Sequence, residues 1–329
     1  METRGACIMG LGSYAPERVL TNDDLSRIVD TNDEWILDHT GIRERRIVAE
    51  DQATSDLACE AARRAMEDAG VSPAQIQLIL VATVSPDHHM PATACLVQDK
   101  LGIKGAGAFD LVCGCTGWVQ ALVTGAQYVQ SGSMDHVLVI GADSLSRITD
   151  WTDRATCVLF GDGACAAVLG PCEPGQGLLA FRMDTIGEAA PLLAIPGGGS
   201  KMRMTPELLA EHMDCVKMNG HEVFKLAVRG CPDIAAATLE QAGLDPHEVD
   251  VLVMHQANLR IIEAAAKRLD IPYDRLPINI DRYGNTSAAT IGLALDEYRR
   301  DHELKTGDVV LFVAFGAGFA LASAVFRWV

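Results

Sequence analysis

Short apolar runs recur along the chain, each bounded by Gly, Pro or charged residues, and they predict buried strands. Examples are LILVA at 78–82, VLVIGA at 137–142 and VLVM at 251–254. Longer segments, such as VQALVTGAQYVQ at 119–130, place apolar residues three or four positions apart, which is typical of helices with one buried face. Strands and helices that alternate in this way indicate an α/β fold.

The longest uncharged stretch runs over 18 residues from Val309 to Phe326, which is long enough for a membrane-spanning helix. Gly316 and Gly318 interrupt it near the middle, with Val and Phe on both sides. Glycine is costly inside a helix, whereas two apolar runs joined by a glycine turn are typical of buried strands. We therefore expect a buried hairpin here and no membrane partner.

The chain contains two similar halves. AMEDAGVSPAQIQLILV at 65–81 resembles TLEQAGLDPHEVDVLVM at 238–254, and DHVLVIGAD at 135–143 resembles GDVVLFVAF at 307–315. In the first pair a helix ends at Gly, a turn contains Pro, and a buried strand follows. The duplication predicts a pseudo-symmetric α/β fold, with 1–172 as the first half and 173–329 as a linker and pocket segment followed by the second half.

Composition narrows the class of protein. Hydrophobic residues make up 49% of the chain, which is a globular balance, and the formal net charge is −17. Nucleic-acid binding depends on Lys and Arg that neutralise phosphates, so a nucleic-acid partner is not expected. An acidic protein partner requires a local basic patch.

The ten cysteines form no CxxC pair and no Cys/His cluster with zinc spacing. We expect buried thiols in a reducing cytoplasm and no metal. The N-terminal segment METRGACIMGLGSYAP contains charges and glycines and does not have the pattern of a signal peptide.

Three polar residues stand at related places in the two halves. Cys115 precedes a helical pattern, where a helix N-terminus stabilises a thiolate and lowers its pKa. Asn285 occupies the corresponding place in the second half, and His255 directly follows the strand at 251–254. Ligands collect at such strand ends in α/β sheets, so the fold is expected to bring the three together.

Each of these residues also has a purely structural interpretation. Cys115 could be a core cysteine, His255 a satisfied polar residue, and Asn285 a helix cap in a turn or a formal glycosylation sequon. A Cys–His–Asn set also occurs in hydrolases of the papain type. The duplicated fold argues against that class.

Motifs spread over almost the whole chain then add a family resemblance. TNDEWILDHTGIRERR (31–46), AFDLVCGCTGW (108–118), HQANLRII (255–262), GNTSAAT (284–290) and FGAGF (315–319) resemble the β-ketoacyl-acyl-carrier-protein synthase III family of the thiolase-fold superfamily. The resemblance implies a layered α-β-α-β-α thiolase-like arrangement. It also implies a homodimer.

The resemblance implies the initiating condensation of type II fatty acid synthesis. Cys115 takes an acetyl or short acyl group from coenzyme A, and malonyl-acyl carrier protein then loses CO₂ and attacks the acyl-Cys115 thioester. His255 Nε2 and the Asn285 amide assist decarboxylation, and the backbone amides of Cys115 and Ala317 form the oxyanion hole. Aimed neutral donors stabilise enolate charge, which suits this chemistry.

The resemblance further assigns binding residues, with coenzyme A as a substrate and no permanently bound cofactor. The expected coenzyme A contacts are Thr31, Trp35, Arg154, Phe224 and Asn258. The expected carrier-protein contacts are Gln256, Ala257, Asn258, Leu259 and Arg260, with Lys225, Lys267 and Arg268 close by in sequence.

Four positions bear on substrate range. Cys113 and Trp118 depart from the family around the nucleophile, and His39 stands where Arg is common and puts one phosphate contact in doubt. Met90 matches a position that in the family reaches across the dimer to the acyl pocket, so Met90 and Trp118 are expected to shape that pocket. The preferred primer stays open.

Two other functions are compatible with parts of this pattern. One is a secondary-metabolism starter synthase or acyltransferase of the same fold, and the other is a non-enzymatic module that binds a carrier protein. The intact Asn285 favours condensation over simple acyl transfer, and intact Cys115 and His255 speak against the binding module.

Overall fold

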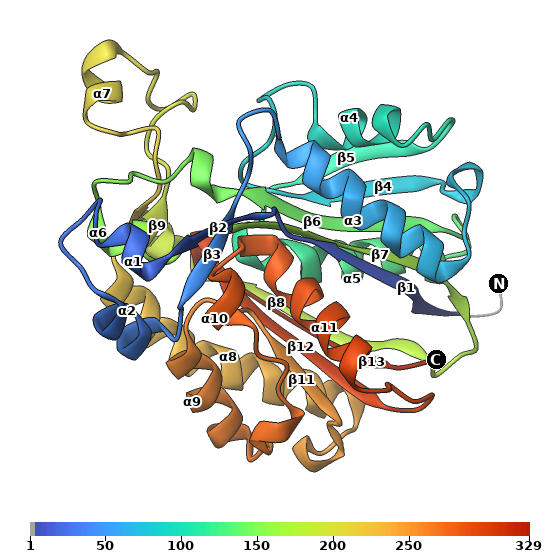
Figure 1. The fold of residues 1–329 in the computed structure, drawn as a ribbon. Coiled ribbons are helices and arrows are strands. Elements are labelled where there is room, and N and C mark those ends of the chain that lie inside the picture. Colours follow the sequence, from blue (N-terminus) through green and yellow to red (C-terminus); the bar gives the residue numbers. More distant parts are fainter. Residues whose placement is uncertain (1–3) are drawn as a thin grey trace.

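Residues 4–329 are described in the computed structural model, and nine of their strands form one continuous sheet (Figure 1). Their spatial order is β11-β12-β13-β8-β1-β7-β6-β4-β5. The bounds are β1 (Gly5–Tyr14), β4 (Leu78–Ala82), β5 (Gly107–Leu111), β6 (Val137–Ser144), β7 (Asp162–Cys172), β8 (Gly177–Thr185), β11 (Val251–Met254), β12 (Val309–Gly316) and β13 (Ala320–Arg327). Two small sheets pair β2 (Arg18–Thr21) with β3 (Glu44–Ile47) and β9 (Leu193–Ala194) with β10 (Lys217–Met218).

The long helices pack on the faces of this sheet, and the short ones lie in connecting segments. The helices are α1 (Asn22–Leu25), α2 (Asp33–Thr40), α3 (Thr54–Ala69), α4 (Thr93–Lys100), α5 (Gly117–Gln130), α6 (Arg154–Cys157), α7 (Pro206–Ala210), α8 (Gly220–Ala242), α9 (Leu259–Leu269), α10 (Ile280–Tyr283) and α11 (Thr290–Asp301). The strands β4, β6, β11 and β12 are buried along their whole length, as expected for strands covered on both faces.

The two halves of the continuous sheet face each other across α5 and α11, so the elements form five layers, α-β-α-β-α, which confirms the predicted thiolase-like arrangement. Alternate side chains of a strand point to opposite faces, so Leu80 of β4 enters the middle core while Ile79 and Val81 pack in the outer core with α3 and α4. The middle core holds α5 and α11 between strands of both halves, and α8 and α9 cover the far side. Figure 1 shows α3 and α8 on opposite sides of the sheet.

The two halves repeat the same strand pairing. In the first half β1 is antiparallel to β7, β7 to β6, and β6 is parallel to β4. In the second half β8, β13, β12 and β11 pair in the same sequence of directions. The halves join in the sheet only through Ala6 of β1 and Gly177 of β8. The boundary at 172/173 falls at the end of β7 and stays a prediction.

The Gly and Pro residues that mark both copies of the repeat stand where the backbone conformation favours them. Gly70 ends α3 at φ 64° and Gly243 ends α8 at φ 70°. Both lie in the left-handed region that glycine adopts without strain, and each is followed by a short turn at Pro73 or Pro246 before the next buried strand.

The apolar stretch at 309–326 forms a buried hairpin. β12 and β13 pair antiparallel from Val309–Arg327 to Gly316–Ala320, which confirms the expectation from sequence. Within residues 4–329, none of the helices has the length and apolar character needed to cross a membrane.

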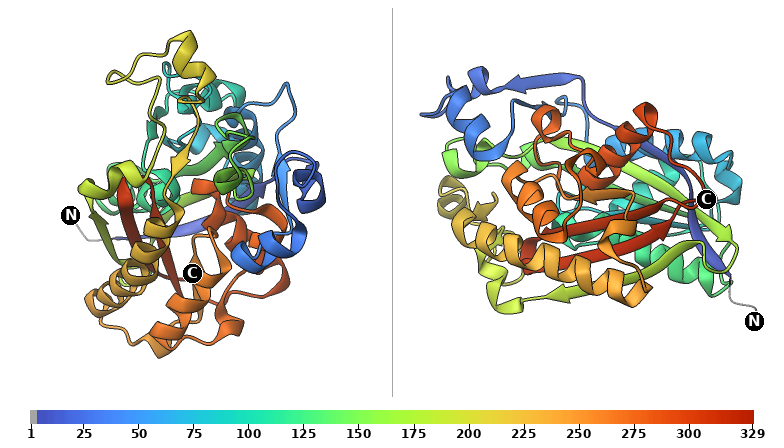
Figure 2. Two further views of the ribbon diagram at one scale, coloured as in Figure 1. Left: turned by 90° about the vertical axis from the view of Figure 1, so that its left-hand side faces the viewer. Right: turned by 90° about the horizontal axis from the view of Figure 1, so that it is seen from below.

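An arm between β9 and β10 projects from the body of the molecule. It carries the short helix α7 and stands clear of the layered core in Figures 1 and 2. No sequence pattern predicted this arm.

Candidate active site

Cys115 lies in a short 3₁₀ turn, Gly114–Thr116, which leads directly into α5. This turn touches the end of β12 across the two halves. A Cβ added to Gly316 would lie 2.6 Å from Cys115 N, and one added to Gly114 would lie 2.9 Å from Ala317 N. Glycine at both positions therefore lets the backbone amides of Cys115 and Ala317 approach each other, as an oxyanion hole requires.

The Cys115 thiol does not have the lowered pKa that its helix-start position predicted. Burial raises the pKa of Cys115 to about 12, the neighbouring Ser287 hydroxyl opposes this shift, and the charge of Asp143 adds to it. The helix N-terminus is present, but burial outweighs it. The thiol therefore keeps its proton near neutral pH in the free protein.

His255 follows β11 directly and is buried. Its backbone N–H donates to Val313 O at 2.9 Å, and its ring meets Phe315 edge-on at 5.2 Å between centroids. Ring Nδ1 lies 2.7 Å from Thr290 Oγ1. Burial lowers the pKa of His255 to about 3, so the imidazole is neutral at physiological pH.

Asn285 is held by backbone hydrogen bonds to the segment before β7. Its N–H donates to Leu159 O at 2.9 Å, and its carbonyl accepts from Gly161 N at 3.0 Å. The side-chain Oδ1 accepts from Ser287 N at 2.8 Å. Because the oxygen is occupied in this way, the NH₂ of the Asn285 amide is left as a donor.

One cavity of about 560 Å³ brings the three catalytic candidates together. Strand ends and helix starts of both halves meet at it, as the duplication predicted. Its lining includes the expected residues Trp35, Cys115, Phe224, His255, Ala257, Asn258, Arg260 and Asn285.

A second, mainly apolar cavity of about 230 Å³ lies on the other side of Cys115. Cys115, Phe160 and Leu193 line both cavities, so the thiol stands between an entrance cavity and a small apolar chamber. The chamber is further lined by Val84, Val112, Leu145, Ile195, Val216, Ser287 and Ala317. The sequence did not predict the Val, Leu and Ile residues among them, because isolated aliphatic residues carry no motif.

Two expected acyl-pocket residues do not line this chamber. Trp118 is 0% exposed and packs edge-on against Phe312 in the middle core, with ring centroids 5.6 Å apart. It faces the core because it lies on the inner side of α5, between the two halves. Met90 is 86% exposed, so within one chain it reaches no acyl group.

The mouth of the larger cavity carries the aromatic and cationic residues expected at a nucleotide. The Arg154 guanidinium lies 4.0 Å from the centre of the Trp35 ring. His39 stacks on Trp35 at 4.4 Å between ring centroids and donates from Nδ1 to Trp35 O. Arg154 Nε and the Thr31 hydroxyl have no hydrogen-bond partner among the described residues.

The expected carrier-protein residues divide into buried and exposed ones. Gln256 is 1% exposed and bonds to Met254 O, Pro277 O and Asn279 N, so its expected role as a surface contact is corrected to a structural one. Leu259 packs against Gly41. Arg260 is exposed but donates to Asp38 at 3.0 Å.

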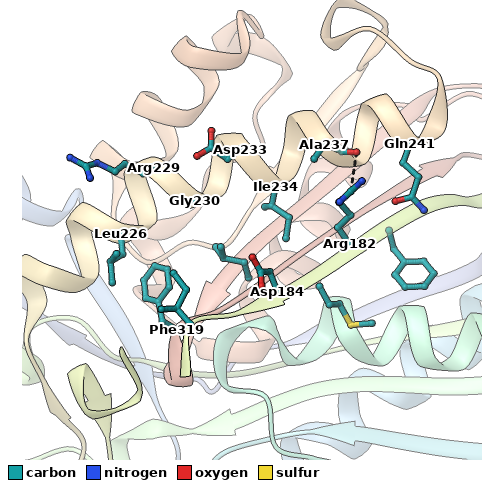
Figure 3. A pocket seen from close by; sticks show the side chains of 14 residues that line it. Arg182, Asp184, Leu226, Arg229, Gly230, Asp233, Ile234, Ala237, Gln241 and Phe319 are labelled. Atoms are coloured by element: carbon teal, nitrogen blue, oxygen red, sulfur yellow. Dashed lines mark hydrogen bonds between the residues drawn. The ribbon is translucent and has the colours of Figure 1, made fainter. Parts of the chain in front are cut away.

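A larger cavity, about 970 Å³, lies elsewhere, between β8 and α8 (Figure 3). Arg182 crosses it to donate to Ala237 O at 3.2 Å. It contains no thiol, His or Asn side chain, so it is not the site of the expected chemistry. Residues 4–329 contain no cluster of three or more His, Cys, Asp or Glu that could hold a metal.

The layered fold, with a cysteine thiol, a neutral histidine and an asparagine amide at one cavity, defines a thiolase-like protein. Family models for 3-oxoacyl-[acyl-carrier-protein] synthase III match residues 109–187, and those for its C-terminal region match residues 239–328. The β-ketoacyl-[acyl-carrier-protein] synthase III of Caldanaerobacter subterraneus is 50% identical over 327 residues, covering 99% of both chains.

Solved structures agree with this match. The 3-oxoacyl-[acyl-carrier-protein] synthase III of Aquifex aeolicus superposes with a TM-score of 0.91 at 42% identity, covering 98% of this chain and 100% of that one. A priming β-ketosynthase of a polyketide biosynthetic pathway superposes with a TM-score of 0.92 at 34% identity, covering 99% and 97%. The chain belongs to the 3-oxoacyl-[acyl-carrier-protein] synthase III family.

Proposed function

We propose that the chain condenses a short acyl-coenzyme A primer with malonyl-acyl carrier protein, giving β-ketoacyl-acyl carrier protein and CO₂. The observation that carries this proposal is the position of Cys115 between an entrance cavity, which also holds His255 and Asn285, and a small apolar chamber. A primer that enters by the first can place its acyl chain in the second.

In the first half-reaction Cys115 Sγ attacks the thioester carbonyl of the primer. A new S–C bond forms, the bond to coenzyme A breaks, and the thiol proton passes to the departing sulfur. The amides of Cys115 and Ala317 stabilise the oxyanion that develops. Trp35 and Arg154 would hold the adenine by stacking and cation–π attraction, with Thr31 near it and Phe224 along the entrance.

In the second half-reaction the bond between the malonyl methylene and its carboxylate breaks and CO₂ leaves. The electron pair moves into an enolate, whose oxygen accepts hydrogen bonds from His255 Nε2 and the Asn285 amide. The carbanion then attacks the acyl-Cys115 carbonyl, and the Cys115 sulfur leaves as a thiolate that takes a proton from solvent water. A neutral His255 suits this step, because an imidazolium could protonate and quench the carbanion.

The carrier protein is proposed to dock beside the entrance at Ala257, Asn258, Leu259 and Arg260. Asn258 caps α9 and donates to His39 O at 2.9 Å, which joins this segment to α2. The ion pair between Arg260 and Asp38 is at least half exposed, and exposed ion pairs contribute little binding energy. An acidic carrier protein with its phosphopantetheine group could therefore compete with Asp38 for Arg260.

We also propose a homodimer and a cytoplasmic location. β5 pairs only with β4 among residues 4–329, so its outer edge is open. Val112, just beyond β5, is 77% exposed although it lines the small apolar chamber. Met90, which is also exposed, lies on the loop between β4 and α4. A second copy placed at this edge would cover both residues.

A labelling experiment tests the proposed function. The protein is incubated with radiolabelled acetyl-coenzyme A, the label is mapped, and malonyl-acyl carrier protein is then added. We expect label on Cys115 and its transfer into β-ketoacyl product. Label on a residue other than Cys115 would contradict the proposed mechanism.

A second candidate is a starter synthase of a secondary pathway, favoured by the similarity to the polyketide priming enzyme at 34% identity. Such an enzyme would carry out the same condensation with a different acyl primer. Labelling of Cys115 without any condensation product would instead support an acyltransferase.

A further inference from the structure

The proposed condensation needs a hydrogen on a particular nitrogen of His255. The neutral imidazole has a single N–H, either on Nδ1 or on Nε2, and only the second form donates from Nε2 into the cavity. Some contact to the other nitrogen must select between the two forms.

Thr290 makes that contact. It is the first residue of α11 and is buried, and its Oγ1 lies 2.7 Å from His255 Nδ1. Within the described part of the chain, this hydroxyl is the only hydrogen-bond partner of the His255 ring, whose other neighbour is the edge-on Phe315 ring.

The single hydroxyl hydrogen of Thr290 has two acceptors in reach. Ser287 O lies at 3.1 Å and also accepts from the Thr290 backbone N–H, which a carbonyl with two lone pairs can do. His255 Nδ1 lies closer, at 2.7 Å, and has no other donor. Donation to Nδ1 uses the shorter of the two contacts and leaves the ring hydrogen on Nε2, whereas donation to Ser287 O would require that hydrogen on Nδ1.

We propose that Thr290 is a positioning residue that fixes His255 as the Nε2–H tautomer by donating its hydroxyl hydrogen to Nδ1. The same short segment then orients both donors of the condensation, because Ser287 N–H holds Asn285 Oδ1 and Thr290 holds His255. This inference rests on the proposed function for its purpose, though not for its geometry.

Three variants test it in the full-length protein. Thr290→Val removes the hydroxyl at nearly constant shape, and Thr290→Ser keeps it. Thr238→Val is the matched control: Thr238 is equally buried and donates to Ile234 O at 2.7 Å within α8. It lines neither cavity that contains Cys115.

We expect Thr290→Val to lower kcat for condensation on the order of 10- to 100-fold, the usual cost of losing a group that orients a functional histidine. The KM for malonyl-acyl carrier protein and the acetylation of Cys115 should change little. Thr290→Ser and Thr238→Val should retain condensation. A fall of acetylation and condensation by the same factor in Thr290→Val would show a merely structural role.

Nitrogen-15 NMR of the histidine-labelled protein gives a readout that does not depend on activity. In the parent protein and in Thr290→Ser, His255 should show a protonated Nε2 and an unprotonated Nδ1, and Thr290→Val should lose this preference. A protonated Nδ1 in the parent overturns the proposal, as does an unchanged tautomer in Thr290→Val. If the parent shows the expected tautomer but never condenses, the proposed function fails while the assignment of Thr290 stands.

Discussion

Cys115 holds its proton tightly for a residue proposed to act as a nucleophile. With a pKa of about 12, its thiolate fraction rises about tenfold for each pH unit through neutral and mildly alkaline pH. The rate of alkylation of Cys115 by iodoacetamide, mapped by mass spectrometry, should rise in this way from pH 7 to 10. A plateau between pH 7 and 8 would show a lowered pKa instead. Labelling of Cys115→Ser provides the background.

Asn285 is expected to contribute to the condensation and not to the acylation of Cys115. Its amide is expected to stabilise only the enolate, so Asn285→Ala should retain acylation of Cys115 and lose condensation, on the order of 100-fold or more in kcat. Acylation is measured with labelled acetyl-coenzyme A alone, and condensation by product formation. Equal loss of both would show that the Asn285 side chain mainly holds the backbone N–H of Ser287.

The buried His255 makes stability depend on pH. Its folded pKa, about 3, lies below the unfolded value near 6.5, so the unfolded chain binds more protons between these values. The stabilisation is fully present above pH 6.5 and is lost as pH falls, by at most about 1.4 kcal/mol per unit. Urea unfolding of the parent and of His255→Gln should diverge in slope below pH 6.5. Parallel curves would contradict this burial.

The sequence identified the residues proposed to act through their own functional groups, and missed those proposed to act through shape or through another residue. Cys115, His255 and Asn285 stand in recognisable strings. Thr290 and Ser287 stand in the same string as Asn285, but only their distances to neighbouring atoms reveal what they orient. Trp118 was expected at the acyl pocket from its place beside the nucleophile in the family motif, but it lies on the side of α5 that faces the middle core.

Among the elements, the contact between the Cys115 turn and the end of β12 is the tightest constraint on the site. Gly316 has φ −171°, an extended backbone that alanine also adopts, so its substitution tests space alone. Gly316→Ala forces a Cβ to 2.6 Å from Cys115 N. We expect a loss of about 1–3 kcal/mol in unfolding free energy and slower acylation of Cys115.

Urea unfolding and acetyl labelling measure these two effects. Gly187→Ala is the control, because no atom lies within 4 Å of a Cβ placed there. Equal behaviour of the two variants would mean that the turn can shift freely.

Element prediction succeeded where local chemistry fixed the backbone. The Gly and Pro residues at 70–73 and 243–246 stand at helix ends and turns in the structure, as predicted. The hairpin at 309–326 was likewise predicted from its central glycines. The arm between β9 and β10 had no such signal, because its path depends on contacts outside its own sequence.

At the scale of the whole molecule, the open edge of β5 predicts association. Size-exclusion chromatography with light scattering should give twice the chain mass of 35.2 kDa. Phe109→Asp places a charge on this edge and should shift the protein toward monomer. Ile28→Asp, at an exposed apolar residue distant in sequence, should not. A parent protein that elutes as a monomer would refute the dimer.

The interleaving of α5 and α11 between strands of both halves has a consequence for synthesis. A nascent chain that ends before α11 leaves the inner side of α5 without its cover, so the first half is not expected to complete its fold while the second is still being made. The amide of Ala317 joins Cys115 only when almost the whole chain has emerged from the ribosome. The reactive thiol therefore gains its full environment as a last step, and an unfinished chain carries a cysteine that is not yet competent to take an acyl group.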